Sequence, residues 1–438
     1  MDILNKILWA GATVLIVYAG LYFTKHLRFV QFHFKEMLKS LFKKEDKENK
    51  GIKPYQTLMM VLAGRIGVGS IAGVALAIYL GGVGSLFWMW VIAFIAAANS
   101  FAETVLGILY KEKDGKDVYK GGPSYYLKNG LGYKKLGAIY ALLVIVSYIF
   151  GFLGIQANTI TKSVQEIVNI SPVIIGLVIV AFTFVTIFGG IKSIASTASK
   201  LVPVMTVGYI GIAFYICILH IDMIPSIFGA IIKDAFSLKP FFGGFIGTFI
   251  IGVQRGIFSN EAGLGTGAIA SSTVATDDAC SQGYLQMIGI YITTMLICTA
   301  TAVIILTSPY QTLSLTDVNG IEITQFAFQF HLGHLGSYVI LFSIILFSFS
   351  TILTGYYDGE SSLKYFLKKV TNKELFYLKG VTLSVLFLGC LLPSNFLWNL
   401  VDIMVAVLAF INIYALLKLK DDIIRELKEY HQKRRKVK

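Results

Sequence analysis

The stretch Arg255-Gly-Ile-Phe-Ser-Asn-Glu-Ala-Gly263 places an arginine, a serine, an asparagine and a glutamate in the middle of the apolar segment 241–275. Such groups are tolerated at membrane depth only where they are buried in protein or line a wet cavity. A second apolar segment, Tyr55–Leu80, is interrupted by four glycines: Gly64, Gly67, Gly69 and Gly73. Both segments are therefore expected to be broken helices in the interior of a membrane protein.

The composition of the whole chain supports this class. Of 438 residues, 55% are hydrophobic and 14% are charged, and the mean hydropathy is +0.71. A soluble domain is roughly 25% charged. These values exclude a soluble enzyme and a disordered protein, and the long apolar runs exclude the alternating strands of a β-barrel. We predict an all-α polytopic membrane protein embedded in a lipid bilayer.

Eleven apolar segments have roughly the length of a membrane-spanning helix. Most prolines, Pro203 among them, are expected at or near segment ends, because proline lacks the N–H that a helix interior needs. The segments are 3–24, 55–80, 84–110, 136–162, 172–190, 201–219, 241–275, 283–308, 335–357, 379–392 and 396–419.

Positive charge is concentrated in alternate connections. Nine Lys and Arg residues lie in 25–53, seven in 111–135, five in 364–379 and nine from 418 onward, whereas the opposite side holds four. Lys192 and Lys200 are assigned to a further connection on the basic side. Cytoplasmic loops carry the excess of Lys and Arg, so the N-terminus is predicted outside and the C-terminus in the cytoplasm of a cell-membrane protein. The basic tail is explained by its position beside the membrane, and no nucleic-acid partner is expected.

The two broken segments occupy matching places once the first span is set aside. Each opens a set of five spans, and because five is odd the second set enters the membrane from the other side. Broken helices at matching places of two inverted halves indicate a transporter site at the midplane. The predicted divisions are an N-terminal helix with a basic linker (1–54), two five-helix repeats (55–220 and 221–420) and a basic tail (421–438). Helix packing remains an alternative role for Gly73 in particular.

The chain contains the motifs Gly64-Arg-Ile-Gly-Val-Gly-Ser-Ile-Ala-Gly-Val74, Gly121-Gly-Pro-Ser-Tyr-Tyr126, Gln156-Ala-Asn158, Arg255-Gly-Ile-Phe-Ser-Asn-Glu-Ala-Gly-Leu-Gly265, Phe349-Ser-Thr351, and Trp398 with Asp402. These motifs resemble those of the alanine-or-glycine:cation symporter family, the sodium:alanine symporter type within the amino acid-polyamine-cation superfamily. The resemblance implies the leucine-transporter-type fold of five plus five inverted helices after one extra helix. It also implies symport of a small neutral amino acid with Na⁺, or with protons in some members, and no cofactor.

Three positions depart from the family pattern. Ser70 stands where the family usually has Asn, Gly355 where it usually has Trp, and Ile411-Asn412 where it has a Pro-Asn pair. The loss of an indole from a pocket wall would open volume. Our hypothesis is a substrate larger than alanine, or a pocket refilled by another aromatic residue such as Tyr356.

The resemblance places the substrate between the two broken helices. Free N–H groups at a helix N-terminus suit a carboxylate, and freed carbonyls suit an ammonium group. Gln156 can bond either group, although an interhelical hydrogen bond is its alternative role. The expected substrate-binding residues are Gly67, Gly69, Ser70, Gln156, Phe258, Ser259, Asn260 and Ala262.

The coupling ion is expected beside the first broken helix. The hydroxyls of Ser350 and Thr351, with carbonyls near Gly64 and Gly67, would supply the hard oxygen ligands of Na⁺. The alternative for both hydroxyls is bonding back to their own helix.

Charged groups inside spans are costly, so pairing is expected. We expect structural or gating ion pairs among five charged residues, although the sequence does not show which are partners: Arg65, Glu103, Arg255, Glu261 and Asp402. The alternative role for Glu261 is that of a proton carrier.

Rival functions find less support. An integral membrane transferase would need acidic or nucleophilic clusters, and only Asp277-Asp278 qualifies; a channel would need a continuous polar stripe. His331 and His334 lack partners at metal-ligand spacing, so no metal beyond Na⁺ is expected. Proton coupling, exchange and uniport remain alternatives within transport, and the oligomeric state is not predicted.

Overall fold

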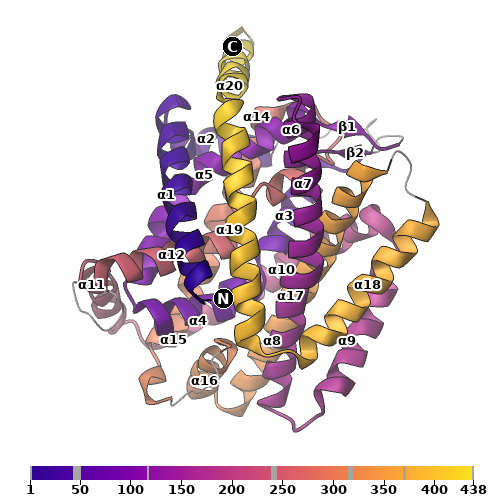
Figure 1. Ribbon diagram of the computed structural model, residues 1–438. Helices are drawn as coiled ribbons and strands as arrows, with labels where there is room; N and C mark the ends of the chain where they lie inside the picture. Colours follow the sequence, from indigo (N-terminus) through magenta and orange to yellow (C-terminus); the bar gives the residue numbers. More distant parts are fainter. Residues whose placement is uncertain are drawn as a thin grey trace.

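The computed structural model describes residues 2–42, 51–115, 118–237, 244–313, 319–367 and 371–436. These residues are helical apart from turns and one short antiparallel hairpin, β1 (Glu112–Lys113) and β2 (Tyr119–Lys120) (Figure 1). The predicted all-α membrane class is confirmed.

Within the described residues, nine helices are long and apolar enough to cross a membrane. Six are single helices: α1 (Asp2–His26), α5 (Ser85–Leu109), α10 (Gly190–Leu219), α17 (His334–Phe366), α18 (Asn372–Leu391) and α19 (Ser394–Lys418). Three are composite: α3 (Pro54–Arg65) with α4 (Val68–Gly81), α7 (Lys134–Ile145) with π-helix η2 (Val146–Phe152) and α8 (Leu153–Gln165), and α14 (Ala279–Ile290) with π-helix η4 (Tyr291–Cys298) and α15 (Thr299–Leu306).

The remaining apolar segments form shorter helices. They are α9 (Pro172–Ile187), α12 (Gly244–Asn260) and α13 (Thr266–Ser271). Residues 241–243 of the predicted segment 241–275 lie outside the described part of the chain.

The structure also contains short helices that the sequence did not predict, most of them near the two ends of the molecule. Their N-termini are often set by proline, as at Pro123 and Pro225, where the missing N–H costs nothing. They are η1 (Val30–Phe32), α2 (Phe34–Leu41), α6 (Pro123–Asn129), α11 (Ile224–Ala235), η5 (Tyr310–Thr312), α16 (Ile321–Leu332) and α20 (Lys420–Lys436).

Three predicted boundaries are wrong by several residues. Helix α17 ends at Phe366 instead of 357, and α18 begins at Asn372 instead of 379; the start of α10 differs most. Helix α10 begins at Gly190 instead of Leu201, so Pro203 lies inside a helix and Lys192 and Lys200 lie on it rather than in a loop. Neighbouring groups in a membrane protein can re-satisfy the carbonyl that an internal proline leaves unpaired. The polar first turns of α10 therefore concealed the true start of the helix.

The broken helices lie at the centre. In the apolar 18-residue stretch of α3–α4, 94% of the residues are buried in the protein. The corresponding shares are 28% for α10 and 33% for α18. Figure 1 shows α18 beside α9 at one edge and α1 beside α19.

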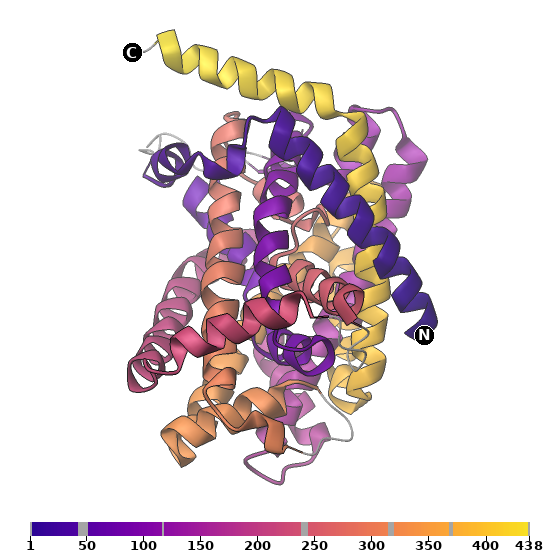
Figure 2. The ribbon, with the colours of Figure 1, turned by 90° about the vertical axis from the view of Figure 1, so that its left-hand side faces the viewer.

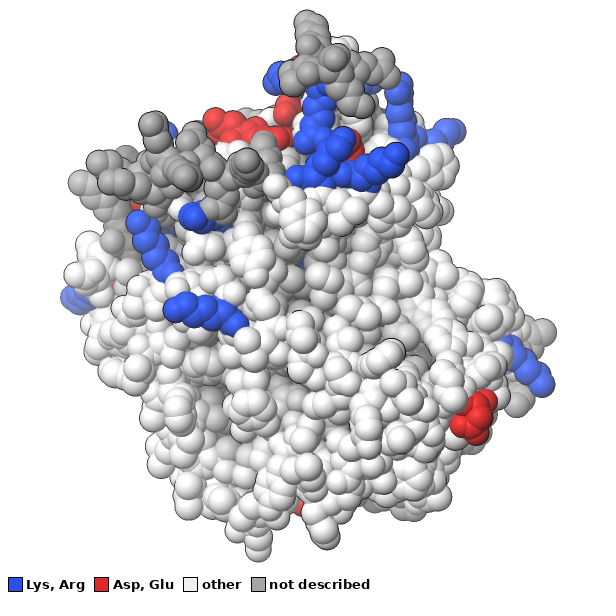
Figure 3. All heavy atoms as spheres, turned by 180° about the vertical axis from the view of Figure 1, so that it is seen from behind, with Lys and Arg blue, Asp and Glu red and all other residues white. Residues whose placement is uncertain are grey.

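Most charged residues in view gather at one end of the molecule, here called the basic end, above a broad belt that is uncharged except near its sides (Figure 3). Helix α20 lies across this end (Figure 2), and α16 lies at the opposite end (Figure 1). An uncharged belt of this breadth is what a bilayer requires of a lipid-facing surface.

Candidate functional site

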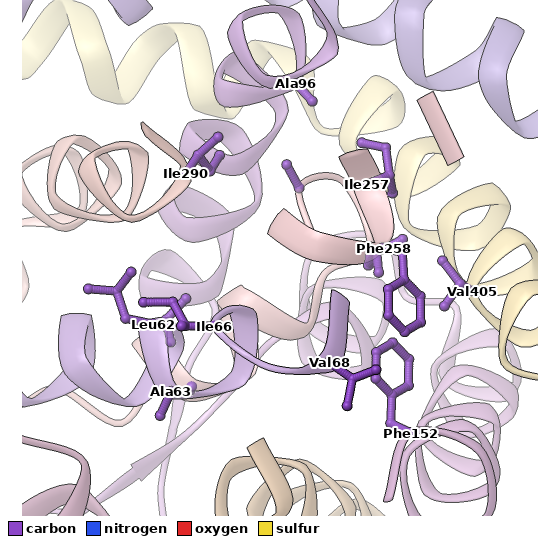
Figure 4. Packing of buried hydrophobic residues seen from close by; sticks show 14 of the residues in the cluster. Leu62, Ala63, Ile66, Val68, Ala96, Phe152, Ile257, Phe258, Ile290 and Val405 are labelled. Carbon is purple, nitrogen blue, oxygen red and sulfur yellow. The ribbon is translucent and has the colours of Figure 1, made fainter. Parts of the chain in front are cut away.

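The first break separates α3 from α4 at Ile66 and Gly67, and the backbone of Gly67 is extended. The N–H of Val68, the first residue of α4, donates to Gln156 Oε1 at 3.1 Å. A Cβ added at Gly67 would lie 2.4 Å from Thr351 Oγ1, so only glycine fits here. The break therefore exposes a helix N-terminus to polar groups of α8 and α17, and Figure 4 shows Ile66 and Val68 on either side of it.

The second break separates α12 from α13. Its backbone is left-handed at Glu261 (φ 55°), Gly263 (φ 86°) and Gly265 (φ 90°); this conformation is uncommon for a residue with a side chain. The Glu103 carboxylate of α5 accepts hydrogen bonds from the N–H of Gly263 (3.2 Å) and of Gly265 (3.0 Å). Asn412 of α19 donates to the same Glu103 oxygen (3.0 Å) and to the Gly263 carbonyl (2.9 Å). Two neighbouring helices thus stabilise the unwound segment.

A hydroxyl pair joins the two breaks. Ser70 Oγ, in the first turn of α4, lies 3.0 Å from Ser259 Oγ near the end of α12. Ser259 Oγ also lies 3.2 Å from Cys298 Sγ, and Thr301 Oγ1 donates to the Ser70 carbonyl at 2.8 Å. Four of the predicted substrate residues therefore lie around the start of α4. Ser70 and Ser259 contact each other there, and Gln156 accepts from Val68, the residue that follows Gly67.

The other predicted substrate residues have different surroundings. Asn260 bonds within its own turn, accepting from the N–H of Ala262 at 3.0 Å, and donates to Thr294 Oγ1 at 3.1 Å. Ala262 is fully buried. A Cβ on Gly69 would lie 2.8 Å from the Phe258 ring. Because Gly69 has no side chain, the Phe258 ring can pack against the first break.

Aromatic rings form one wall of this region. The Phe258 ring stacks on Phe152 with centroids 5.2 Å apart and also contacts Trp398 at 5.0 Å; Figure 4 shows Phe258 and Phe152 facing each other. A Cβ added at Gly355 would lie 2.7 Å from Leu153 and 3.2 Å from Tyr148. The space that a larger residue at position 355 would need is thus occupied by Leu153 and Tyr148.

An oxygen cluster lies beside the first break. Ser350 Oγ and Thr351 Oγ1 each donate to the Ala63 carbonyl, at 3.2 and 3.0 Å, and Thr351 Oγ1 also lies 3.4 Å from the Gly64 carbonyl. Both hydroxyls also bond back to Phe347 O on their own helix. The sequence reading missed Ala63, whose carbonyl direction depends on where α3 ends.

The chemistry of this donor set fits a small cation. Hydroxyl and carbonyl oxygens from a broken helix and its neighbour are neutral, hard ligands of the kind that hold Na⁺ in transporters. Gly67 was expected to add its carbonyl, but that oxygen accepts from the Ser70 N–H at 3.1 Å.

Two of the five charged residues that the sequence assigned to ion pairs are partners of each other. Arg255 pairs with Asp402 of α19, and its guanidinium lies 4.8 Å from the Trp398 ring centroid. Glu261 accepts from Thr266 Oγ1 at 2.9 Å. The sequence left the partners of Arg255 unassigned, and in the structure its carboxylate partner is Asp402.

The other arginine is bound through neutral groups. Arg65 donates to the Gln286 carbonyl at 2.9 Å and to Ser100 Oγ at 3.1 Å. A Cβ on Gly267 would lie 3.0 Å from Arg65 Nη2 and 3.4 Å from Glu103 Oε1. Because Gly267 has no side chain, both charged groups can lie beside it. Among the described residues, neither Glu103 nor Glu261 comes within ion-pair distance of Arg65.

Residues 1–438 match the family described as the sodium:alanine symporter family. The chain belongs to the sodium:alanine symporter family. It is a transporter and not an enzyme, as the sequence reading expected.

Two relatives illustrate the range of the family. A protein of Bacillus subtilis (strain 168) named probable sodium/glutamine symporter GlnT is 36% identical, over 99% of this chain and 91% of the relative. The sodium/alanine symporter AgcS of Methanococcus maripaludis is 34% identical, over 99% of this chain and 97% of the relative.

A solved structure, a Na⁺-coupled sialic acid symporter in a substrate-bound outward-open state, shares the fold with a TM-score of 0.51. Its sequence is 12% identical, and the match covers 95% of this chain and 82% of that one. At that identity the likeness concerns the fold alone.

Proposed function

We propose that this sodium:alanine symporter family member imports a small neutral amino acid, of the alanine or glycine class, together with Na⁺. The observation that carries the proposal is the oxygen cluster of Ser350, Thr351 and Ala63 beside the break between α3 and α4. Na⁺ bound there would join α17 to the end of α3. Ion binding would thereby stabilise one arrangement of the two helices over others, which is what coupling requires.

The substrate carboxylate would bind at the N-terminus of α4, where the N–H of Gly69 and the Ser70 hydroxyl meet the positive end of the helix dipole. The ammonium group would bind carbonyls at the end of α12, near Phe258, Ser259 and Asn260. Ser70 and Ser259 lie 3.0 Å apart, which supports a site in which one small substrate contacts both breaks.

The packing of side chains against Gly355 supports a substrate with a small side chain. Leu153 and Tyr148 fill the volume that the missing indole would have opened. Glutamine, the substrate in the name of one relative, is the larger alternative. Proton coupling and amino-acid exchange are the alternative modes of transport.

The proposed architecture is two inverted repeats of five helices after α1, with about eleven transmembrane helices in all. The breaks α3–α4 and α12–α13 open the repeats, 55–220 and 221–420, and the site lies where the breaks meet. With the basic end in the cytoplasm, the N-terminus is outside and α20, in the tail 421–438, is inside.

The test is uptake of labelled alanine into proteoliposomes under an inward Na⁺ gradient, with K⁺ as the matched control. Thr351→Val should reduce sodium-dependent uptake at least about tenfold, since it removes one ligand without changing shape. Thr382→Val is the control variant, because Thr382 is also buried and, within the described part of the chain, its hydroxyl bonds only the carbonyl four residues back on its own helix. Uptake that is equal in Na⁺ and K⁺, or equal losses in the two variants, would contradict the proposal; competition by glutamine would decide between the two substrates.

A further inference from the structure

An apolar groove of about 420 Å³ runs along the outside of the protein between α10 and α17. Its floor consists of the buried side chains of Met205, Tyr209 and Phe347. Val204 and Phe342 on its rim are 69% and 63% exposed. The volume lies in the range of roughly 300–1,000 Å³ that is typical of ligand sites.

The floor of the groove contacts both parts of the proposed site. Met205 Sδ accepts a hydrogen bond from Ser350 Oγ at 3.8 Å. The Tyr209 hydroxyl lies 2.8 Å from Thr301 Oγ1, and Thr301 in turn donates to the Ser70 carbonyl at 2.8 Å. One side chain therefore separates the groove from the oxygen cluster, and two separate it from the first turn of α4.

The position of the groove determines what occupies it. Both helices that form it span the membrane, and its exposed rim is continuous with their lipid-facing surface. A void there would forfeit dispersion contacts along its whole lining, and the apolar material that reaches it in a bilayer is hydrocarbon. Tyr338, 57% exposed near the start of α17, marks the end at which a headgroup would lie, because tyrosine favours the membrane interface.

We propose that this groove binds one acyl chain of a membrane phospholipid, and that the bound chain strengthens Na⁺ binding by holding Met205 against Ser350. Methionine has three rotatable bonds and adapts to whatever packs on it. The Ser350 hydroxyl has a single proton, for which Met205 Sδ competes with the Ala63 and Phe347 carbonyls. A chain in the groove favours Met205 as the acceptor by holding Sδ in place. The lone pairs of Ser350 Oγ are then directed toward the Ala63 carbonyl, where the ion would bind. The sodium part of this inference rests on the proposed function.

Gly208 allows a direct test, since it lines the groove and a Cβ added there would meet no atom within 4 Å. Gly208→Leu should therefore fill the groove without strain. Gly211→Leu is the matched control: Gly211 is on the same helix and also faces open space, but it does not line the groove. Lipid retention is measured by native mass spectrometry of the full chain extracted from phospholipid vesicles. Sodium binding is measured as the rise in melting temperature in NaCl relative to KCl.

The wild-type protein and Gly211→Leu should retain one more phospholipid than Gly208→Leu. The Na⁺ concentration that produces half of the maximal rise in melting temperature should increase about fivefold in Gly208→Leu and in neither of the others. A fivefold change is at the lower end of typical coupling between two binding sites. Equal lipid retention in the two variants, or retention of an apolar molecule without a phosphate headgroup, overturns the binding site. Equal sodium dependence overturns the coupling. Failure of the proposed function would be distinct, because the wild-type protein itself would then show no sodium-specific shift.

Discussion

Asn319 donates a hydrogen bond of 2.9 Å to Asn158 Oδ1, although 161 positions separate the two residues. The Asn319 amide also donates to Ser394 Oγ at 3.0 Å, and its oxygen accepts from Thr159 Oγ1 at 3.2 Å. All four side chains are buried. The network fastens the start of α16 to α8 and α19 at the end of the molecule opposite the basic end.

Asn319→Ala should loosen α16 while leaving the rest of the fold intact. Each buried group left without a partner costs about 1–3 kcal/mol, and every 1.4 kcal/mol is about tenfold in an equilibrium constant. We expect amide hydrogen exchange in 321–332 to accelerate at least about tenfold by these values. Gln329→Ala, at an exposed position of the same helix, is the control. Equal exchange in the two variants would show that the network does not fasten this helix.

Asp402 should contribute strongly to the stability of the folded protein. Its ion pair with Arg255 is buried, and removing one partner of a buried pair typically costs about 3–5 kcal/mol, because the other charge is left uncompensated. Asp402→Ala should therefore lower the melting temperature by several degrees in detergent, whereas Asp222→Ala, at an exposed position, should not. The double variant Arg255→Met/Asp402→Leu should recover part of the loss; failure of both single variants to destabilise would contradict a buried pair.

The positions of the two broken helices could be predicted from the sequence, because glycine and buried polar residues are both costly in a continuous lipid-facing helix. The partners of the charged residues could not. Arg255 and Asp402 are 147 positions apart in the chain, and their pairing depends on how α12 packs against α19.

Backbone ligands were equally hidden from the sequence. The carbonyl of Ala63 contacts both hydroxyls because α3 ends two residues later, and an alanine gives no chemical signal of this role. Asn319 could have been flagged as a polar residue before an apolar helix, but its partners belong to two other helices. Sequence patterns thus locate elements, and tertiary packing decides which backbone atoms face each other.

Glu103→Ala should destabilise the second break, whereas Glu103→Gln should largely preserve it. One carboxylate oxygen accepts from the N–H groups of Gly263 and Gly265 and from Asn412, and an amide oxygen can replace that acceptor. Alanine would orphan two buried N–H groups, at about 1–3 kcal/mol each. Melting temperature and sodium-dependent uptake should both fall for Ala. If Gln is as damaging as Ala, the charge of Glu103 rather than its acceptor oxygen is what the site requires.

Helix α20 is fastened to α2 by a cluster of titratable groups at the basic end. Glu36 forms an ion pair with Arg434 and accepts from the Tyr430 hydroxyl at 3.2 Å. The His431 ring lies 5.9 Å from that of His33. Burial lowers the pKa of His431 below its usual 6.5, and the neighbouring His33 lowers the pKa further, while Glu36 raises it. Burial alone would raise the pKa of Glu36, but Lys39 and Arg434 bring it below 4.5.

These shifts predict that α20 detaches as the pH falls. Because the pKa of His431 is lowered in the docked state, docking has its full stability above about 6.5 and weakens as the pH falls below that value. The lowered pKa of Glu36 adds a second loss only below 4.5. Hydrogen exchange or protease cleavage in 420–436 should therefore increase between pH 7 and about pH 5, and His431→Gln should remove this dependence while leaving the loss below 4.5. An identical pH profile in the variant would assign the change to another group of the cluster.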